Sequence, residues 1–151
     1  CTCTEREIHG YLHRISRPLL DRMDLSAEMS RIPFEELLKK QPKGTKEEDS
    51  AAIRSRVEKV QKIQVRRYEG TSYRFNGDLD SAGVQKYCAL GAAEENLLEG
   101  MYQKFSLTAR SCHRLLKVAR TLADMDESEN IGKKHLAEAA AFRAADEKYW
   151  G

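Results

Sequence analysis

From about residue 49 onward, apolar residues recur at the spacing of an α-helix almost without interruption. In the first of these segments, Ile53, Val57 and Val60 follow the i, i+4, i+7 pattern of a helix with one apolar face. The same spacing returns in four later segments, at residues 84–88, 93–105, 112–122 and 136–143. Five such helices predict a compact helical bundle from about Asp49 to Trp150.

The chain upstream of this bundle has a different pattern. Thr4 precedes a segment with acidic residues in its first turn and apolar residues at helical spacing, which predicts a capped helix that ends by Ser16. Pro18 then opens a short helical turn. Residues 25–30 alternate between apolar and polar side chains, the period-two pattern of a strand. No second strand is evident to pair with this one, so it implies a sheet outside the chain.

A polar run at residues 39–49 contains Pro42 and Gly44 and is typical of a linker, with one helical turn expected just before it at 34–38. We therefore predict two parts. Residues 1–45 form the end of a domain whose sheet lies elsewhere, and residues 46–151 form a helical domain. The chain starts with Cys1 rather than methionine, so we expect an upstream region.

Composition limits the possible partners. The chain is 40% hydrophobic and carries a formal net charge of +2, so its overall charge gives no case for nucleic acid. The basic residues between Arg54 and Arg67 either meet phosphates or form a solvated helix face. No apolar run approaches the roughly 18 residues of a membrane helix, so we expect a cytoplasmic protein without a membrane partner. Without a secretory signal, the four cysteines are expected to be reduced thiols.

Near the start, Cys1, Cys3, His9 and His13 supply four potential zinc ligands, and the two histidines lie one helical turn apart. Their spacing is too irregular for a standard zinc finger. Two alternatives stay open: a closed site formed by these four residues, and a site that Cys1 and Cys3 complete with partners outside the chain.

The other cysteines and histidines lie in the helical part. Cys88 and Cys112 fall on apolar stripes and are expected in the core. His113 and His135 have no neighbouring cysteine or carboxylate constellation in the sequence, so we expect ordinary surface or core side chains there.

The helix that starts near Thr108 has an unusual first turn, because it contains Arg110. A basic residue there opposes the helix dipole. A helix N-terminus attracts phosphate, however, and an arginine adds a planar fork that matches phosphate oxygens. Arg110 is thus a candidate for phosphate binding, with Arg114 one turn later on the same face. The alternative is that Arg110, Arg114 and Lys117 form a solvated face, and spacing leaves both open.

A second arginine stands out at the end of the short turn after Pro18. Arg22 follows two leucines and precedes the predicted strand. It either projects as a functional group or pairs on the surface with Asp21 or Asp24, a contact usually worth less than about 1 kcal/mol.

The motifs of ATP hydrolysis are absent from the sequence. There is no G-x-x-x-x-G-K-[ST] phosphate loop and no apolar run ending in paired acids that could hold magnesium. A G-x-S-x-G nucleophile turn is absent as well. This chain by itself is therefore not expected to hydrolyse ATP.

Several segments together resemble a known family. They are residues 1–4 (CTCT), 11–16 (YLHRIS), 18–25 (PLLDRMDL), 33–37 (PFEEL), 107–124 (LTARSCHRLLKVARTLAD), 135–139 (HLAEA) and the closing Tyr149-Trp150. This set resembles the C-terminal part of magnesium chelatase ChlI-like AAA+ ATPases of the ComM/YifB type. The resemblance implies a mainly α fold, in which residues 46–151 are the helical lid and residues 1–45 end the α/β nucleotide-binding core with one orphan strand.

The same resemblance implies roles for the two arginine segments. Arg22 looks like the arginine finger, a catalytic residue that reaches the γ-phosphate bound by a neighbouring subunit. Arg110 is similar to sensor 2, which contacts the nucleotide of its own subunit, with Arg114 beside it. ATP and Mg²⁺ are then cofactors of the full-length protein and are not expected on this chain alone.

Proteins of this type are hexameric ATPases that act on DNA in branch migration and competence. The resemblance therefore implies a homo-oligomeric ring, contacts with the protein's own core, and DNA as a partner. Two alternatives stay open: the motor subunit of a metal chelatase, and a helical interaction module that works without nucleotide.

Overall fold

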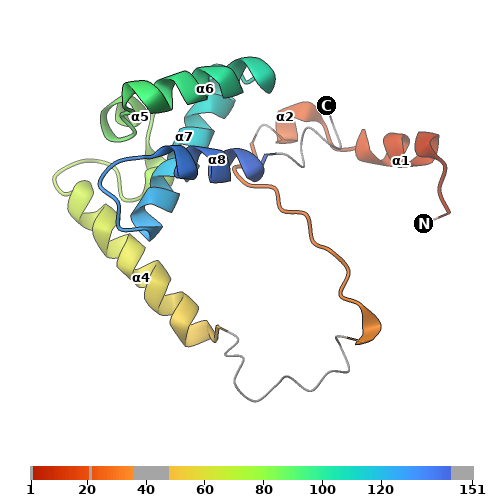
Figure 1. Cartoon of the computed structure of the whole chain (residues 1–151), viewed down its shortest axis with the longest axis horizontal. Helices are drawn as coiled ribbons and strands as arrows, with labels where there is room; N and C mark the ends of the chain where they lie inside the picture. Colours follow the sequence, from red (N-terminus) through yellow and green to blue (C-terminus); the bar gives the residue numbers. More distant parts are fainter. Residues whose placement is uncertain (1, 21, 36–47, 144–151) are drawn as a thin grey trace.

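The computed structural model describes residues 2–20, 22–35 and 48–143. Every regular element in these ranges is a helix, which confirms the mainly α fold class (Figure 1). The elements are α1 (Glu5–Leu12), α2 (Arg17–Leu20), α4 (Ser50–Arg67), the 3₁₀ helix η1 (Asn76–Asp78), α5 (Ser81–Tyr87), α6 (Ala92–Lys104), α7 (Ala109–Met125) and α8 (Lys133–Ala141).

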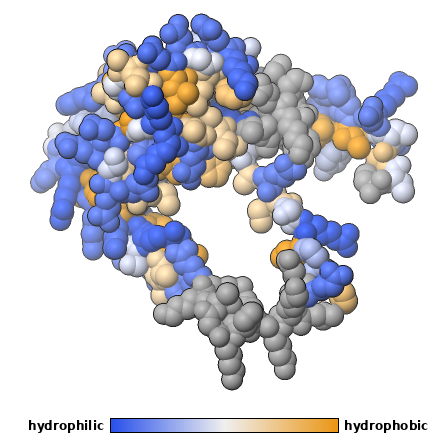
Figure 2. All heavy atoms as spheres, in the orientation of Figure 1, coloured by the Kyte–Doolittle hydropathy of each residue, from blue (hydrophilic) through white to orange (hydrophobic). Residues whose placement is uncertain are grey.

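Helix α7 is the centre of the bundle. It contacts α4, α5, α8 and η1, and α6 packs on α8 (Figure 1). In the described ranges, the buried apolar residues other than Leu20 form one cluster to which α7 contributes most: Tyr68, Leu79, Val84, Cys88, Leu107, Leu115, Leu116, Ala119, Ala123, Ile131, Leu136 and Ala139. The five predicted helices are thus present and share one core. The face shown in Figure 2 is largely hydrophilic over this bundle, with smaller apolar areas between.

The start of α7 lies where the sequence predicts it. Thr108 has an extended backbone and its side chain accepts a hydrogen bond from the Ser111 N–H at 3.1 Å. In return the Ser111 hydroxyl accepts one from the Thr108 N–H at 2.8 Å. Two of the backbone donors that a helix start leaves without an intrahelical acceptor are satisfied in this way.

Replacing Thr108 with alanine is expected to lower the free energy of unfolding by about 1 kcal/mol, because both cap contacts of the central helix are weakened. Urea unfolding followed by far-UV circular dichroism measures this. Thr108→Ser keeps the hydroxyl and should unfold like the original chain. Equal stability of the alanine variant would show that the cap contributes nothing.

Helix α4 is long and only its C-terminal end is buried. Gln64 lies in the core, as does Tyr68 just after the helix, whereas Ile53 and Val57 are exposed on the half that projects from the bundle (Figure 1). The sequence predicted a continuous apolar stripe from Ile53. Within residues 48–143, packing covers only the second half of that stripe, the end at which Arg67 of α4 bonds to Asp124 of α7.

The predicted strand is not formed. Residues 25–33 carry no regular secondary structure, and no strand occurs within the described ranges. A strand needs a neighbouring strand to bond its backbone, and the pattern itself pointed to a sheet outside the chain. The two upstream helices do form: Thr4 caps α1 in a capping box with Glu7, and Pro18 lies in the first turn of α2.

The segment after α2 is attached to the bundle. The backbone N–H of Ser26 donates to the carbonyl of Phe142, just after α8, at 2.9 Å. This bond holds the segment close to the end of α8. Leu20 at the end of α2 is also buried, at 6% exposed, but it is not a member of the core cluster of the bundle.

Parts of the remaining predictions fall on residues 36–47, outside the described ranges. Residues 34 and 35 are helical, as expected for the start of the turn at 34–38. The predicted linker and the boundary between residues 1–45 and 46–151 stay predictions. No helix in the described part of the chain is long and apolar enough to cross a membrane.

Candidate functional site

Arg22 lies on an exposed turn just after α2. Its Nη1 donates to the carbonyl of Pro18 at 2.9 Å, and its backbone N–H donates to the carbonyl of Leu19 at 2.9 Å. The Pro18 contact uses one of the five guanidinium N–H donors. The guanidinium is thus oriented by its own turn and still accessible to a ligand from outside.

Arg110 is the second residue of α7, and its side chain is exposed. The cap uses the N–H groups of Thr108 and Ser111. Those of Ala109 and Arg110 have no acceptor within the helix, because the first turn has none to offer. Two backbone donors and one guanidinium thus lie at the positive end of the helix dipole, an arrangement that suits an anionic group.

Arg114 is not part of a solvated face. Its side chain is 14% exposed, its Nη1 donates to the carbonyl of Met23 at 3.2 Å, and its Nε lies 3.3 Å from Oδ1 of Asp24. Asp24, one of the two surface partners considered for Arg22, thus pairs with Arg114 in the structure. Asp21, the other proposed surface partner, lies outside the described residues. A nucleotide contact of Arg114 stays a prediction.

Lys117 continues the same face of α7 but points to a different element. Its Nζ donates to the carbonyl of Gly77 in η1 at 3.0 Å. The three basic residues that the sequence groups together therefore separate into three environments. Arg110 is exposed, Arg114 contacts the segment after Arg22, and Lys117 contacts the bundle.

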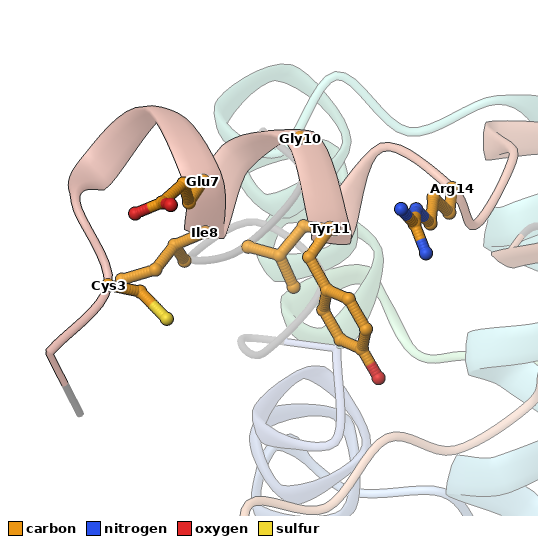
Figure 3. Close-up of a pocket in the computed structure, with 7 residues that line it drawn as sticks. Cys3, Glu7, Ile8, Gly10, Tyr11 and Arg14 are labelled. Atoms are coloured by element: carbon orange, nitrogen blue, oxygen red, sulfur yellow. The ribbon is translucent and has the colours of Figure 1, made fainter.

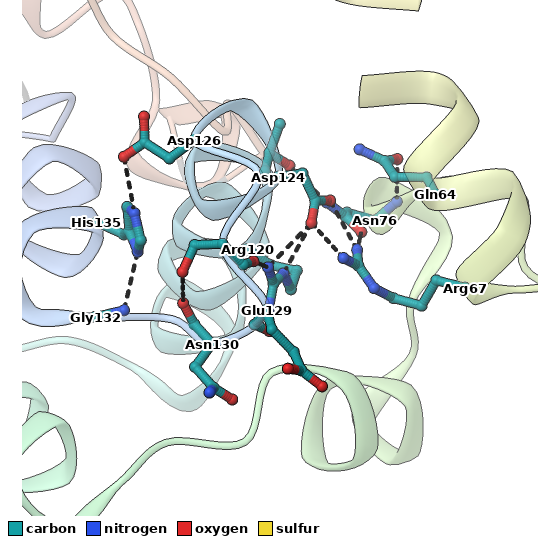
Figure 4. A network of polar contacts seen from close by, with 12 residues as sticks. Gln64, Arg67, Asn76, Arg120, Asp124, Asp126, Glu129, Asn130, Gly132 and His135 are labelled. Carbon is teal, nitrogen blue, oxygen red and sulfur yellow. Dashed lines mark hydrogen bonds and ion pairs between the residues drawn. The ribbon is translucent and has the colours of Figure 1, made fainter. Parts of the chain in front are cut away.

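Four polar residues that contact one another join α4, η1 and α7 (Figure 4). They are Arg67, Asn76, Arg120 and Asp124, and we call them the Asp124 cluster. The Asp124 side chain has no exposed surface. Nη1 of Arg67 donates to Oδ2 of Asp124 at 2.7 Å, and Nη2 of Arg67 donates to Oδ1, so the ion pair is bidentate. Asn76 Nδ2 donates to Oδ2 at 2.9 Å and Arg120 Nε to Oδ1 at 3.1 Å.

The other polar atoms of the cluster are also used. Oδ1 of Asn76 accepts from the hydroxyl of Tyr68 at 2.6 Å, and the Asn76 N–H donates to Oε1 of Gln64 at 3.0 Å. The Nη groups of Arg120 donate to backbone carbonyls in the loop after α7, those of Ser128 at 2.6 Å and Glu129 at 2.7 Å. Because its members are hydrogen-bonded, the buried cluster specifies how these elements pack.

The sequence pattern grouped Arg67 with the basic residues of its helix that either meet phosphates or form a solvated face, and this prediction was wrong. Arg67 belongs to the core-facing side of α4, three residues after the buried Gln64, and its pairing with Asp124 raises its pKa. Two signals pointed to the cluster. Arg67 is in helical phase with Gln64, and Arg120 precedes Asp124 by one turn on α7, a helix with a strong apolar stripe.

His135 is a core side chain, one of the two expected positions, but it has a carboxylate partner that the sequence pattern did not indicate. It is buried, its Nε2 lies 3.1 Å from Oδ2 of Asp126, and its Nδ1 accepts from the Gly132 N–H at 2.9 Å. An accepting Nδ1 places the proton on Nε2, which donates to Asp126. Hydrogen bonds from Lys134 and then His135 lower the pKa of the Asp126 carboxyl. The nine-residue separation hid this contact in the sequence.

The metal candidates are only partly described. Cys1 lies outside the described residues. Cys3 is exposed and lines a hollow beside α1 with Glu7, Ile8 and Tyr11 (Figure 3). His9 and His13 contact each other instead, with their Nε2 atoms 2.8 Å apart. No group of three or more potential ligands occurs in the described part of the chain.

The two downstream cysteines lie as predicted on inward-facing positions. Cys88 is buried in the core, and burial raises the pKa of its thiol to about 11. Cys112 on α7 is half-buried and packs against the same core, and burial raises its pKa too. Both thiols are therefore protonated at neutral pH and suited to packing rather than nucleophilic chemistry.

Comparison with known protein families assigns both parts of the chain. Residues 47–143 match the model for the family described as magnesium chelatase, subunit ChlI C-terminal. Residues 1–37 match the model described as magnesium chelatase, subunit ChlI. The chain therefore belongs to the magnesium chelatase ChlI-like family, and its helical fold is that of the C-terminal lid domain in these AAA+ proteins.

Individual relatives show which type of protein within this family the chain resembles. The chain is 39% identical to competence protein ComM of Haemophilus influenzae over 139 residues, 92% of this chain and 26% of that protein. It is also 39% identical to YifB of Escherichia coli over 144 residues, 95% of this chain and 27% of that protein. Protein Rv2897c of Mycobacterium tuberculosis is 26% identical over 143 residues, covering 95% of this chain and 27% of the relative. The chain is of the ComM/YifB type and spans about a quarter of the length of these curated relatives.

Proposed function

We propose that this chain is the lid region of a cytoplasmic AAA+ ATPase motor, in which Arg110 and Arg22 serve nucleotide held outside the chain. Arg110 acts as sensor 2 on the ATP of its own subunit. Arg22 acts as the arginine finger on the ATP of a neighbouring subunit in a homo-oligomeric ring, a hexamer by family resemblance. ATP and Mg²⁺ are bound by the upstream core of the full-length protein.

The observation that carries this proposal is the open end of α7. Arg110 is exposed there beside two backbone N–H groups that the cap leaves unused. A basic residue at this position disfavours the isolated helix, and an anion at the same place reverses that effect. A triphosphate supplies such an anion. Since the sequence has no phosphate loop, the nucleotide must be held by another part of the protein.

DNA is the proposed substrate of the full-length motor, which would couple ATP hydrolysis to remodelling or branch migration. The support is the name of one relative, competence protein ComM, together with the shared ComM/YifB type. The basic residues of α4 that remain exposed, such as Lys59 and Lys62, offer phosphate contacts on this chain. DNA-stimulated ATP turnover of the full-length protein tests this part separately.

Replacing Arg110 with alanine is expected to weaken ATP binding by the full-length protein about 10- to 100-fold, the value of one lost hydrogen-bonded contact to a charged group. Lys133→Ala is the matched control, because Lys133 is also an exposed cation in the first turn of a bundle helix. Nucleotide affinity is measured by calorimetry and ATP turnover by phosphate release. Unchanged affinity and turnover in the Arg110 variant would favour an interaction module that works without nucleotide.

The motor subunit of a metal chelatase is the second candidate, favoured by the family description of residues 47–143. Such a motor would use the same two arginines and drive insertion of magnesium into a porphyrin. The two candidates are separated by the substrate that stimulates ATP turnover: DNA for the first, and porphyrin with its partner subunits for the second.

A further inference from the structure

We infer that Arg114 is a positioning residue for the arginine finger: it holds the chain just after Arg22 against the lid helix α7, so that the lid sets the orientation of the finger. This inference rests on the proposed role of Arg22. It assigns to Arg114 a function that acts through Met23 and Asp24 rather than through direct contact with nucleotide.

The contact is formed by residues 91 positions apart. Nη1 of Arg114 donates to the backbone carbonyl of Met23 at 3.2 Å, and Nε lies 3.3 Å from Oδ1 of Asp24. The Arg114 side chain is 14% exposed, whereas that of Asp24 is 63% exposed. A largely buried guanidinium therefore binds the main chain of the residue that directly follows the finger.

A second contact between described residues also holds this segment. The backbone N–H of Ser26, four residues after Arg22, donates to the carbonyl of Phe142 just after α8. The Arg22 guanidinium is in turn bonded to the carbonyl of Pro18 in its own turn. Because the side chain is fixed to the turn and the turn is fixed to the bundle, the position of the bundle determines where the guanidinium points.

The same helix connects this contact to the proposed nucleotide sensor. Arg110 and Arg114 are four residues apart on α7 and so lie one turn apart on one face. A movement of α7 that follows nucleotide contact at Arg110 displaces Arg114 by a similar amount. It thereby shifts Met23 and Asp24, and with them the finger that serves the neighbouring site. Binding in one subunit would in this way adjust catalysis in the next.

The test uses the full-length protein and separates turnover from nucleotide affinity. Arg114→Ala is expected to lower kcat about 10- to 100-fold, because a misplacement of about 1 Å at a catalytic group has effects of this size. The Kd for ATP should stay within about twofold of the original value. Lys117→Ala is the matched control, since it removes a cation and a side-chain bond to a carbonyl of the same bundle, and it should leave kcat unchanged.

A double variant decides between positioning and mere stabilisation. If Arg114 acts through Arg22, Arg22→Ala with Arg114→Ala should turn over no more slowly than Arg22→Ala alone. A further multiplicative loss would overturn the inference, as would a weakened Kd in the Arg114 variant. Should Arg114→Ala fail to fold, Asp24→Asn tests the same contact from the side of its exposed partner, Asp24. This variant should lower kcat less, because the bond from Arg114 to the Met23 carbonyl persists. An unchanged kcat in both variants contradicts the inference, whereas an unchanged kcat in Arg22→Ala contradicts the proposed function itself.

Discussion

Substituting alanine for Arg22 is expected to lower ATP turnover of the full-length protein on the order of 10³-fold, the lower end of the contribution of an arginine finger. Negative charge spreads over the transferred phosphoryl oxygens in the transition state, and a guanidinium positioned there stabilises it. In the proposed role the finger serves the nucleotide of the neighbouring subunit, so the affinity of its own subunit for ATP should change little. Phosphate release at saturating ATP measures the effect.

Action between subunits can be tested by mixing. On the proposed role, subunits with Arg22→Ala and subunits with an inactivated upstream phosphate loop are each expected to be inactive, whereas a mixed assembly should contain interfaces where an intact finger faces an intact loop. Turnover should therefore reappear on mixing. Arg31→Ala is the control, because it removes another exposed arginine nine residues away. Full activity of the Arg22 variant, or no recovery in mixtures, would show that Arg22 is not a finger acting in trans.

Substituting alanine for Asp124 is expected to lower the free energy of unfolding by about 3–5 kcal/mol, enough to unfold much of the chain. The change leaves Arg67 and Arg120 close together without their shared carboxylate, and both side chains are largely buried. The cost comes from two desolvated positive charges rather than from the loss of one attraction. Far-UV circular dichroism during urea unfolding of residues 1–151 measures the change.

The pair of Glu48 and Arg56 supplies the control for this experiment. Its Oε2 and Nη2 are 2.7 Å apart, a contact as short as those in the Asp124 cluster, but the side chains are 43% and 56% exposed. Exposed pairs contribute about 0–1 kcal/mol, so Glu48→Ala should have a small effect. Equal effects of the two substitutions would mean that burial does not determine the strength of the Asp124 cluster.

Local features of the fold could be predicted because they depend on neighbouring residues. The capping of α1 by Thr4 and of α7 by Thr108 requires only a hydroxyl at the right distance from a backbone N–H. The α-helical spacing of residues 112–122 likewise fixed the inward face of α7. Arg110 was identified for the same reason, since its conflict with the helix dipole is a property of the helix alone.

The strand predicted at residues 25–30 shows the limit of local information. Alternation of apolar and polar side chains gives a segment two different faces, but a strand forms only where another backbone offers hydrogen bonds. In the described structure Ser26 of this segment instead bonds to the carbonyl of Phe142 just after α8. Met23 and Asp24, which directly precede the segment, contact Arg114 of α7.

The sequence by itself determined the helical class, the caps, the inward face of α7 and the family, because each is carried by residues close together in the chain or by motifs that keep their order. Only the tertiary structure decided which charged groups meet. Arg67 bonds to Asp124 across 57 positions and Arg114 to Asp24 across 90. Such pairs depend on how helices cross and on which side chains lose water when they do, and neither is encoded in the spacing of one helix. That is why the exposed arginine Arg110 could be found in the sequence, whereas the contact linking α7 to the segment after Arg22 could not.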